Sequence, residues 1–231
     1  MSEGLARKRA LRGLARKVGL PPSADLDVLD MALTHDSYAS EHPRQAHSNE
    51  RLEFLGDAVL GAVVAGELYA RHPQRSEGQL SRMRASLVSR AALARSAEAL
   101  DLGACLLLGR GESAAGGAHR PSVLADAFEA LVGAIFHIGG MHAAQTFVNR
   151  SHLAHATSSE TIDPKTALQE YAQARFKKAP HYAVTAQSGP PHARTFTVAV
   201  DVAGQTLGTG SGTTKKQAQT DAAREALAHL P

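Results

Sequence analysis

Residues 49–60 of this 231-residue chain combine acidic and aliphatic side chains in a pattern that a helix separates into two faces. At about 100° per residue, Glu50, Glu53 and Asp57 fall within an arc of ~60° on one face of an α-helix. The opposite face is aliphatic and consists of Leu52, Leu55, Val59 and Val63. The stretch therefore predicts a packed helix that carries an acidic stripe.

A second segment repeats this arrangement. Asp126 and Glu129 lie one helical turn apart. The apolar residues opposite them are Leu124, Phe128, Leu131 and Ile135. An acidic face of this kind usually only contacts water. Two such helices that pack through neighbouring faces would instead bring four carboxylates together, those of Glu53, Asp57, Asp126 and Glu129.

A cluster of four carboxylates favours a bound cation. Two carboxylates about 4 Å apart repel each other by ~4 kcal/mol at an effective dielectric constant of ~20, which raises their pKa values unless a cation lies between them. Mg²⁺ suits such a site because it prefers oxygen ligands, retains several waters and often lies beside substrate phosphates. We therefore expect a Mg²⁺ site, with Mn²⁺ as a substitute ion.

The charge is unevenly distributed along the chain. Residues 163–231 contain eight Lys and Arg against five acids, whereas residues 1–162 contain seventeen of each, so the net charge of +3 belongs to the last third. A region that collects carboxylates binds a polyanion poorly by itself, and a separate basic module would hold such a substrate. The length of the chain is compatible with two modest domains.

The periodicity of the sequence changes after residue 153. Helical periodicity covers residues 48–71, 77–100, 121–138 and 141–153. These stretches predict an all-α domain over residues 1–153, and the polar residues 154–162 indicate a linker. Residues 163–231 predict a small α+β domain of order α-β-β-β-α. Its predicted elements are a helix at 164–175, strands at 182–186, 195–200 and 205–208, and a helix at 213–229.

The acidic segments also resemble those of a known family, the bacterial ribonuclease III endonucleases, which cut double-stranded RNA. The resemblance is carried by the segments Asn49–Leu60, Ala32–Tyr38, Glu77–Ser81 and Leu124–Ala130. One departure is Ala114, which replaces a lysine that is common among relatives and is not a metal ligand.

The resemblance implies a role for each acid. The residues expected to hold the catalytic metal are Glu53, Asp57, Asp126 and Glu129. Among them, Asp57 and Glu129 are expected to be catalytic, while Glu50 and Glu77 support metal or substrate binding. The implied reaction hydrolyses phosphodiester bonds in double-stranded RNA and leaves 5′-phosphate and 3′-hydroxyl ends, in the processing of precursor rRNA and other RNAs. Whether one or two ions act is left open.

Residues 163–231 resemble the double-stranded RNA-binding domain. The matching segments are Leu168–Tyr171, Gly189–His192 and Gly210–Ala218. Lys215 and Lys216 open a predicted helix, where free backbone N–H groups and the helix dipole favour phosphate, although two adjacent lysines can also be an ordinary solvated helix end. The side chains expected to contact 2′-hydroxyls and minor-groove edges are those of Gln169, Glu170 and His192. Gln219 stands where a further lysine often follows in the family, so we expect a weaker grip on phosphate.

A homodimer is the economical arrangement for such an enzyme, because a duplex has two strands and one chain provides one acid cluster. The resemblance places the helix of residues 49–60 at the subunit interface. Phe54 lies near the acidic arc and is the candidate for a side chain that contacts the partner subunit, with a buried core ring as the alternative. A catalytically silent RNA-binding protein on the same fold is the competing function. Silent versions tend to lose the acids, whereas all six are present here.

Composition argues against several other classes of protein. Cys105 is the only cysteine, which excludes an intramolecular disulfide and favours a reducing cytoplasm. No signal-peptide core follows the basic amino terminus, and no run of about 18 apolar residues is evident, so we expect a cytoplasmic protein without a membrane span. No Gly-x-x-x-x-Gly-Lys-Ser/Thr loop occurs, and a nucleotide cofactor is therefore not expected.

Overall fold

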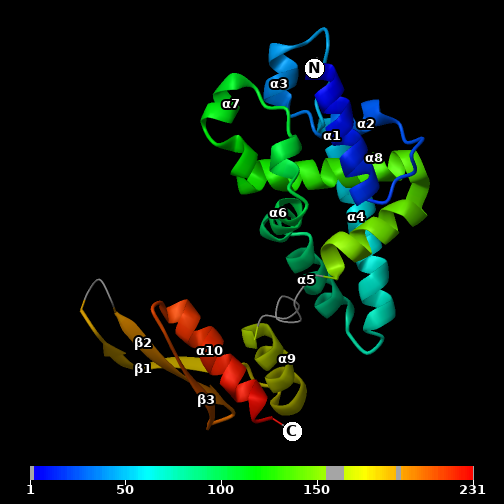
Figure 1. Cartoon of the computed structure of the whole chain (residues 1–231). Helices are drawn as coiled ribbons and strands as arrows, with labels where there is room; N and C mark the ends of the chain where they lie inside the picture. The colour runs from blue at the N-terminus through cyan, green and yellow to red at the C-terminus, as the bar shows by residue number, and fades with distance from the viewer. Residues whose placement is uncertain (1–2, 155–163, 191–193, 231) are drawn as a thin grey trace. The chain divides into compact units, whose positions relative to one another are not determined.

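The computed structural model describes residues 3–154, 164–190 and 194–230, and the chain divides into two compact units, Met1–Ser158 and Ser159–Pro231 (Figure 1). The helices of the first unit are α1 (Glu3–Lys17), α2 (Leu26–Ala32), α3 (Asp36–Glu41), α4 (Glu50–Arg71), α5 (Glu77–Leu87), α6 (Arg90–Ala99), α7 (Arg110–Ala114) and α8 (Pro121–Val148). Short 3₁₀ turns occupy Leu102–Cys105 and Gly117–His119, and a π-helical turn, Asn149–Leu153, follows α8.

The two longest helices, α4 and α8, form the centre of the first unit and make the most extensive contact between any two elements. Their backbones meet at Gly56 of α4 and Gly133 of α8. A Cβ atom on Gly56 would lie 1.8 Å from the carbonyl oxygen of Glu129, and one on Gly133 would lie 2.2 Å from the carbonyl oxygen of Leu52. Only glycine allows this approach, which brings the acidic face of α4 beside that of α8.

The helices agree with the sequence expectation in part. The predicted helix at 48–71 is α4, and the predicted break between 138 and 141 falls at Gly140, whose φ of 71° interrupts α8. The single helix predicted over 77–100 was wrong, because α5 ends at Leu87 and α6 begins at Arg90. Ser89 caps the new helix by accepting a hydrogen bond from the Ala92 N–H at 3.4 Å. Helices α1, α2, α3 and α7 were not predicted.

By length and composition alone, one helix of the described residues, Pro121–Leu153, is long and apolar enough to cross a membrane, with a mean hydropathy of 1.5. In the folded chain, however, 61% of the apolar window is buried inside the protein. Phe128, Leu131 and Ile135 are almost completely buried there, so the hydropathy of α8 is that of a core helix.

The second unit consists of α9 (Pro164–Phe176), the strands β1 (His181–Ser188), β2 (Thr195–Val202) and β3 (Gln205–Gly212), and α10 (Lys215–Ala228). The sheet is antiparallel with the order β1-β2-β3. This unit has the expected order α-β-β-β-α, with strands somewhat longer than predicted. Apart from Ala154, the predicted linker at 154–162 lies outside the described residues.

The core of the second unit lies between the sheet and its helices, and its buried residues are Leu168, Val198, Val200, Ala218, Ala222, Ala223 and Ala226. α10 lies very close to β3, because the strand positions that face the helix are glycines. A Cβ atom on Gly210 would lie 2.1 Å from the Ala222 nitrogen, and one on Gly208 would lie 2.6 Å from the Ala226 nitrogen. The alternation of glycine along β3 is thus required by the helix that covers it.

Side chains of α10 also cover the outer edge of β3. The Ser211 N–H donates to the Asp221 carboxylate at 3.3 Å, and the Thr213 N–H donates to the Gln217 amide oxygen at 3.1 Å. The Thr209 N–H donates to the Glu225 carboxylate. Side chains four residues apart on α10 therefore accept hydrogen bonds from N–H groups two residues apart along the edge of β3. The two spacings match because four helical residues and two strand residues each span about 6–7 Å.

Candidate metal centre and nucleic-acid interface

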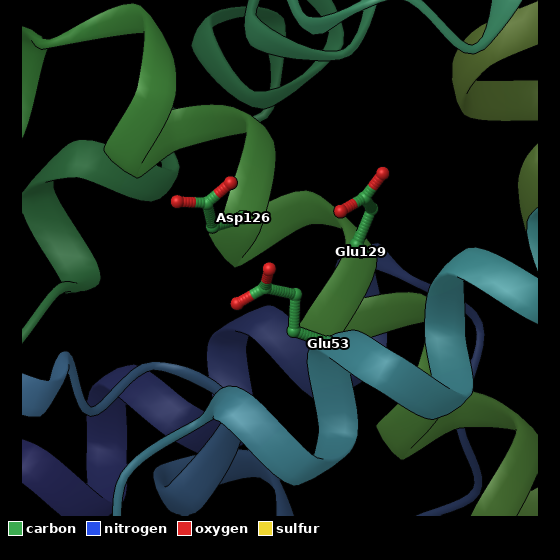
Figure 2. A group of neighbouring side chains, drawn as sticks. All are labelled: Glu53, Asp126 and Glu129. Atoms are coloured by element: carbon green, nitrogen blue, oxygen red, sulfur yellow. The ribbon is translucent and has the colours of Figure 1, made fainter.

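Three carboxylates from the two central helices meet in one place. Glu53 of α4 and Asp126 and Glu129 of α8 each offer an oxygen atom, and these atoms all lie within 4.8 Å of one another. Figure 2 shows the three side chains projecting into the same space between the helices. All three are half-buried, so they face one another at the edge of the core rather than open water.

Asp57 stands beside this group without belonging to its tightest part. It is exposed on α4, one turn after Glu53. Its negative charge raises the pKa of both Glu129 and Glu53, which requires that it lie near them. The four predicted ligands are therefore neighbours, with Glu53, Asp126 and Glu129 in closest contact.

The pKa values of the three clustered carboxyl groups are all raised. Burial and the charges of Asp57, Glu53 and Asp126 raise the pKa of Glu129 from 4.5 to about 7. Burial is also the largest cause of the raised pKa values of Glu53 and Asp126. The carboxylates thus hold their protons more tightly than usual, which is the condition that a cation relieves.

Two basic residues that were not predicted lie near the cluster. Arg90, the first residue of α6, lowers the pKa values of Glu53, Asp126 and Glu129 by its positive charge. His35 lowers that of Asp126 in the same way. His35 also caps α3, because its Nδ1 accepts a hydrogen bond from the Ser37 N–H at 3.1 Å. Arg90 was missed because the break between α5 and α6 was missed.

The two supporting acids lie in different surroundings. Glu50, exposed at the start of α4, accepts a hydrogen bond from Ser48 Oγ at 2.9 Å and raises the pKa of Glu53. Glu77, at the start of α5, accepts one from Ser81 Oγ at 2.7 Å. Glu77 does not contribute to the raised pKa values of the cluster and instead lines a pocket of about 580 Å³ beside Tyr69.

Phe54 is not a core residue. Its side chain is 81% exposed on α4, so the alternative of a buried core ring was wrong for the single chain. Tyr69, further along the same helix, is 77% exposed. Ala114, the site of the missing lysine, is exposed at the end of α7.

Four of the five residues predicted to contact nucleic acid lie within the described part of the second unit. Lys215 and Lys216 are exposed at the start of α10, which Thr214 caps by accepting a hydrogen bond from the Gln217 N–H at 3.1 Å. On α9, Gln169 is exposed and Glu170 is half-buried. The fifth, His192, lies outside the described residues.

Sequence comparison decides the family. The profile described as Ribonuclease-III-like matches residues 25–156, and the profile described as Double-stranded RNA binding motif matches residues 164–230. The protein named Ribonuclease 3 of Heliobacterium modesticaldum is 47% identical over 93% of this chain and 92% of its own length. The chain belongs to the ribonuclease III family. The Ribonuclease 3 of Symbiobacterium thermophilum is 48% identical over 88% of this chain and 87% of its own length.

Solved structures agree with this assignment. The nuclease domain of ribonuclease III from Campylobacter jejuni is 38% identical with a TM-score of 0.57, over 62% of this chain and 96% of that domain. That structure is described as having a region involved in dimer formation. The expected ribonuclease III-type endoribonuclease, with a helical nuclease domain followed by a double-stranded RNA-binding domain, is thereby confirmed.

Proposed function

We propose that this chain hydrolyses double-stranded RNA in a Mg²⁺-dependent reaction, with Glu53, Asp126 and Glu129 as metal ligands. The observation that carries the proposal is the close approach of these three carboxylates on the two central helices, within 4.8 Å. The donor set fits a hard divalent cation, because all three ligands are carboxylate oxygens, and burial is the largest cause of their raised pKa values. Mn²⁺ takes the same ligand type and is the substitute ion.

We propose Asp57 and Glu129 as the catalytic residues. The negative charges of the other three acids all raise the pKa of Glu129, and among these charges that of Asp57 has the largest effect. Glu129 has a pKa of about 7 and would give up its proton to hold a cation. Asp57 is exposed, so it faces the side from which substrate and water arrive.

The bound ion would supply a water of lowered pKa and would offset negative charge on the scissile phosphate. The protein holds the carboxylates in fixed positions through the glycine contacts between α4 and α8. Arg90 adds a positive charge where the phosphate brings a negative one. Release of the 3′-oxygen leaves 5′-phosphate and 3′-hydroxyl ends, and precursor rRNA is the expected substrate from the family resemblance.

The second unit would hold the RNA. Lys215 and Lys216 stand at the N-terminus of the 14-residue helix α10, whose free N–H groups favour phosphate. Gln169 and Glu170 lie on α9 and would contact 2′-hydroxyls, and His192 keeps the same expected role. Recognition of this kind depends on the shape of the duplex and reads little sequence.

We propose further that two chains form a homodimer through α4. An apolar stripe of helical spacing runs along the outer side of this helix and contains Phe54, Ala58, Ala62, Ala65 and Tyr69. Phe54 and Tyr69 are unusually exposed for aromatic residues. A stripe of small residues with an aromatic ring near each end suits two helices that pack closely around a two-fold axis.

The pocket beside Tyr69 supports an antiparallel arrangement. Phe54 and Tyr69 are about 22 Å apart along the helix, so a two-fold axis midway between them would place Phe54 of each subunit against the pocket of the other. Leu68 and Leu80 give that pocket an apolar lining, and Glu77 stands on its wall. In that arrangement Glu77 would approach the acid cluster of the partner subunit.

Cys105 supports a reducing location. It is a free thiol, half-buried, and burial is the main reason that its pKa is raised. Cys105 is the only cysteine of the sequence, so an intramolecular disulfide cannot form, which is typical of proteins in a reducing compartment. We therefore place the enzyme in the cytoplasm.

The test is cleavage of an end-labelled RNA duplex by the wild-type chain and by Glu129→Gln, each with Mg²⁺ and with EDTA. Binding is followed in parallel by gel shift in Ca²⁺. We expect the wild-type chain to cut only with Mg²⁺, and the variant to lose cutting by at least 100-fold while its RNA affinity stays within about twofold. Binding without cutting by the wild-type chain under every divalent ion would make this protein a silent RNA-binding member of the family.

A further inference from the structure

Lys165 is held in one position by contacts from two other elements. It is the second residue of α9 and is half-buried. Its Nζ donates a hydrogen bond to Gln219 Oε1 of α10 at 2.6 Å, and the same atom lies 4.9 Å from the centre of the Tyr182 ring of β1. Lysine side chains on a protein surface usually sample many rotamers, whereas this ammonium group is fixed.

The partner Gln219 places this charge near the two predicted phosphate-binding lysines. Gln219 follows Lys215 by four residues and Lys216 by three, so all three positions adjoin on the surface of α10. On its own helix, Lys165 lies one turn before Gln169, on the same face. The ammonium of Lys165 therefore connects the predicted phosphate contacts of α10 with the predicted 2′-hydroxyl contact of α9.

The charge of Lys165 is not neutralised by its neighbours. Its two contacts are a neutral amide oxygen and a ring face. Within residues 164–190 and 194–230, no carboxylate forms an ion pair with it; the acid of α10 that is paired there, Asp221, binds Arg224 at 2.8 Å. An ammonium group has three donors, and the hydrogen bond to Gln219 uses one.

We propose that Lys165 is a third phosphate-binding lysine of the RNA surface, positioned by Gln219 beside Lys215 and Lys216. The proposal rests on the proposed RNA binding by this unit. It replaces the expectation that Gln219 weakens the grip on phosphate: the amide of Gln219 draws in a positive charge from α9. A charge that is already ordered binds phosphate without losing further side-chain freedom, which favours affinity.

Salt dependence separates this role from a purely structural one. Each phosphate contact contributes about one unit to the slope of log K against log salt concentration, so loss of one contact lowers that slope by about one. A residue that only joined α9 to α10 would change stability without changing the slope.

The experiment measures the affinity of the full chain for an RNA duplex of about 16 base pairs between 50 and 300 mM KCl, in Ca²⁺ and in the Glu129→Gln background. Four chains are compared: the parent, Lys165→Gln, Lys165→Gln with Gln219→Lys, and Lys178→Gln. The last removes an equal charge from beyond the other end of α9, about 20 Å away along the helix. Thermal unfolding of each chain reports on its fold.

We expect Lys165→Gln to weaken binding three- to tenfold at 150 mM KCl and to lower the slope by about one. The exchange of the two residues should restore both, because it keeps the hydrogen bond and returns the charge to the same place. Lys178→Gln should leave affinity within twofold. An unchanged slope in Lys165→Gln, or equal losses in Lys178→Gln, would overturn the proposal. Failure of the parent chain to bind the duplex would instead refute the proposed function.

Discussion

At the scale of single residues, the acid cluster lowers the stability of the metal-free protein as the pH rises. Glu129 binds its proton with a pKa of about 7 in the folded chain, against 4.5 for an ordinary glutamate. The unfolded chain loses that proton at lower pH than the folded chain does. Stability of the metal-free protein is therefore greatest below pH 4.5 with respect to this group and falls as the pH rises toward 7.

Replacement of Glu129 by Gln should consequently stabilise the metal-free chain at pH 8. The gain should be about 1 kcal/mol, because a half-buried group is partly screened by water and the full shift overstates its effect. Little gain is expected at pH 4.5, where Glu129 is protonated in the folded chain and about half protonated in the unfolded chain. Urea unfolding in EDTA at the two pH values measures the difference. Equal effects of the substitution at both would contradict the origin of the pKa shift.

The sequence predicted the cluster better than its surroundings. Glu53, Asp126 and Glu129 were found because helical spacing and the resemblance to ribonuclease III indicated the same residues. Arg90 was missed together with the break before α6, and its proximity to the acids depends on how α6 packs against α8. The exposure of Phe54 was likewise undecided, since a helix position beside an acidic arc can face a core or a partner.

At the scale of elements, the site depends on the distance between α4 and α8. Gly56→Ala would force the helices apart, because its Cβ would lie 1.8 Å from the Glu129 carbonyl oxygen. We expect a loss of about 2–4 kcal/mol in the free energy of unfolding and weaker binding of Mg²⁺. Denaturant unfolding and calorimetric Mg²⁺ titration measure the two effects.

Gly13→Ala is the matched control for this substitution. Gly13 lies in α1, where nothing lies within 4 Å of an added Cβ atom, so alanine should stabilise the chain by about 0.5–1 kcal/mol. If Gly56→Ala behaved in the same way as Gly13→Ala, the close contact would not determine the geometry of the cluster.

The edge of β3 provides a second prediction at this scale. Glu225 accepts hydrogen bonds from the N–H and the hydroxyl of Thr209, and the N–H contact is the main reason that the pKa of Glu225 is lowered. Glu225→Ala should expose the Thr209 N–H to water and accelerate its hydrogen exchange at least tenfold. Amide exchange followed by mass spectrometry tests this. Unchanged exchange at Thr209 would show that the helix does not protect the strand edge.

Sequence patterns predicted the boundaries of the helices and strands less well than their presence. Residues 77–100 read as one periodic helix because Val88 and Ser89 do not break the apolar pattern, yet Ser89 caps a new helix. Glycines usually weaken the prediction of a strand, as those of β3 do here. The reason for them is visible only in the folded chain, where the backbone of α10 lies too close to β3 for a Cβ atom.

At the scale of the whole molecule, the proposed dimer makes the enzyme dependent on protein concentration. Phe54→Ala should weaken the dimer at least tenfold, because it removes a large exposed ring from the apolar stripe. Sedimentation equilibrium measures the effect. Leu5→Ala removes another exposed side chain, 61% exposed on α1, and should leave the dimer unchanged. An unaltered dimer in Phe54→Ala would remove Phe54 from the interface.

The division into a nuclease unit and an RNA-binding unit follows from charge and periodicity in the sequence, and the profiles match the same two regions. Each unit has its own hydrophobic core. Cooperation requires a substrate long enough to reach both, which is why a duplex is the appropriate probe for the complete chain.

The central claim is that Glu53, Asp126 and Glu129 bind the catalytic ion. The most direct measurement is anomalous scattering from crystals of the wild-type chain and of Glu129→Gln grown with Mn²⁺. We predict an anomalous peak between the three carboxylates in the wild-type chain and its loss or marked reduction in the variant. A peak elsewhere, or the same peak in both chains, would contradict the assignment.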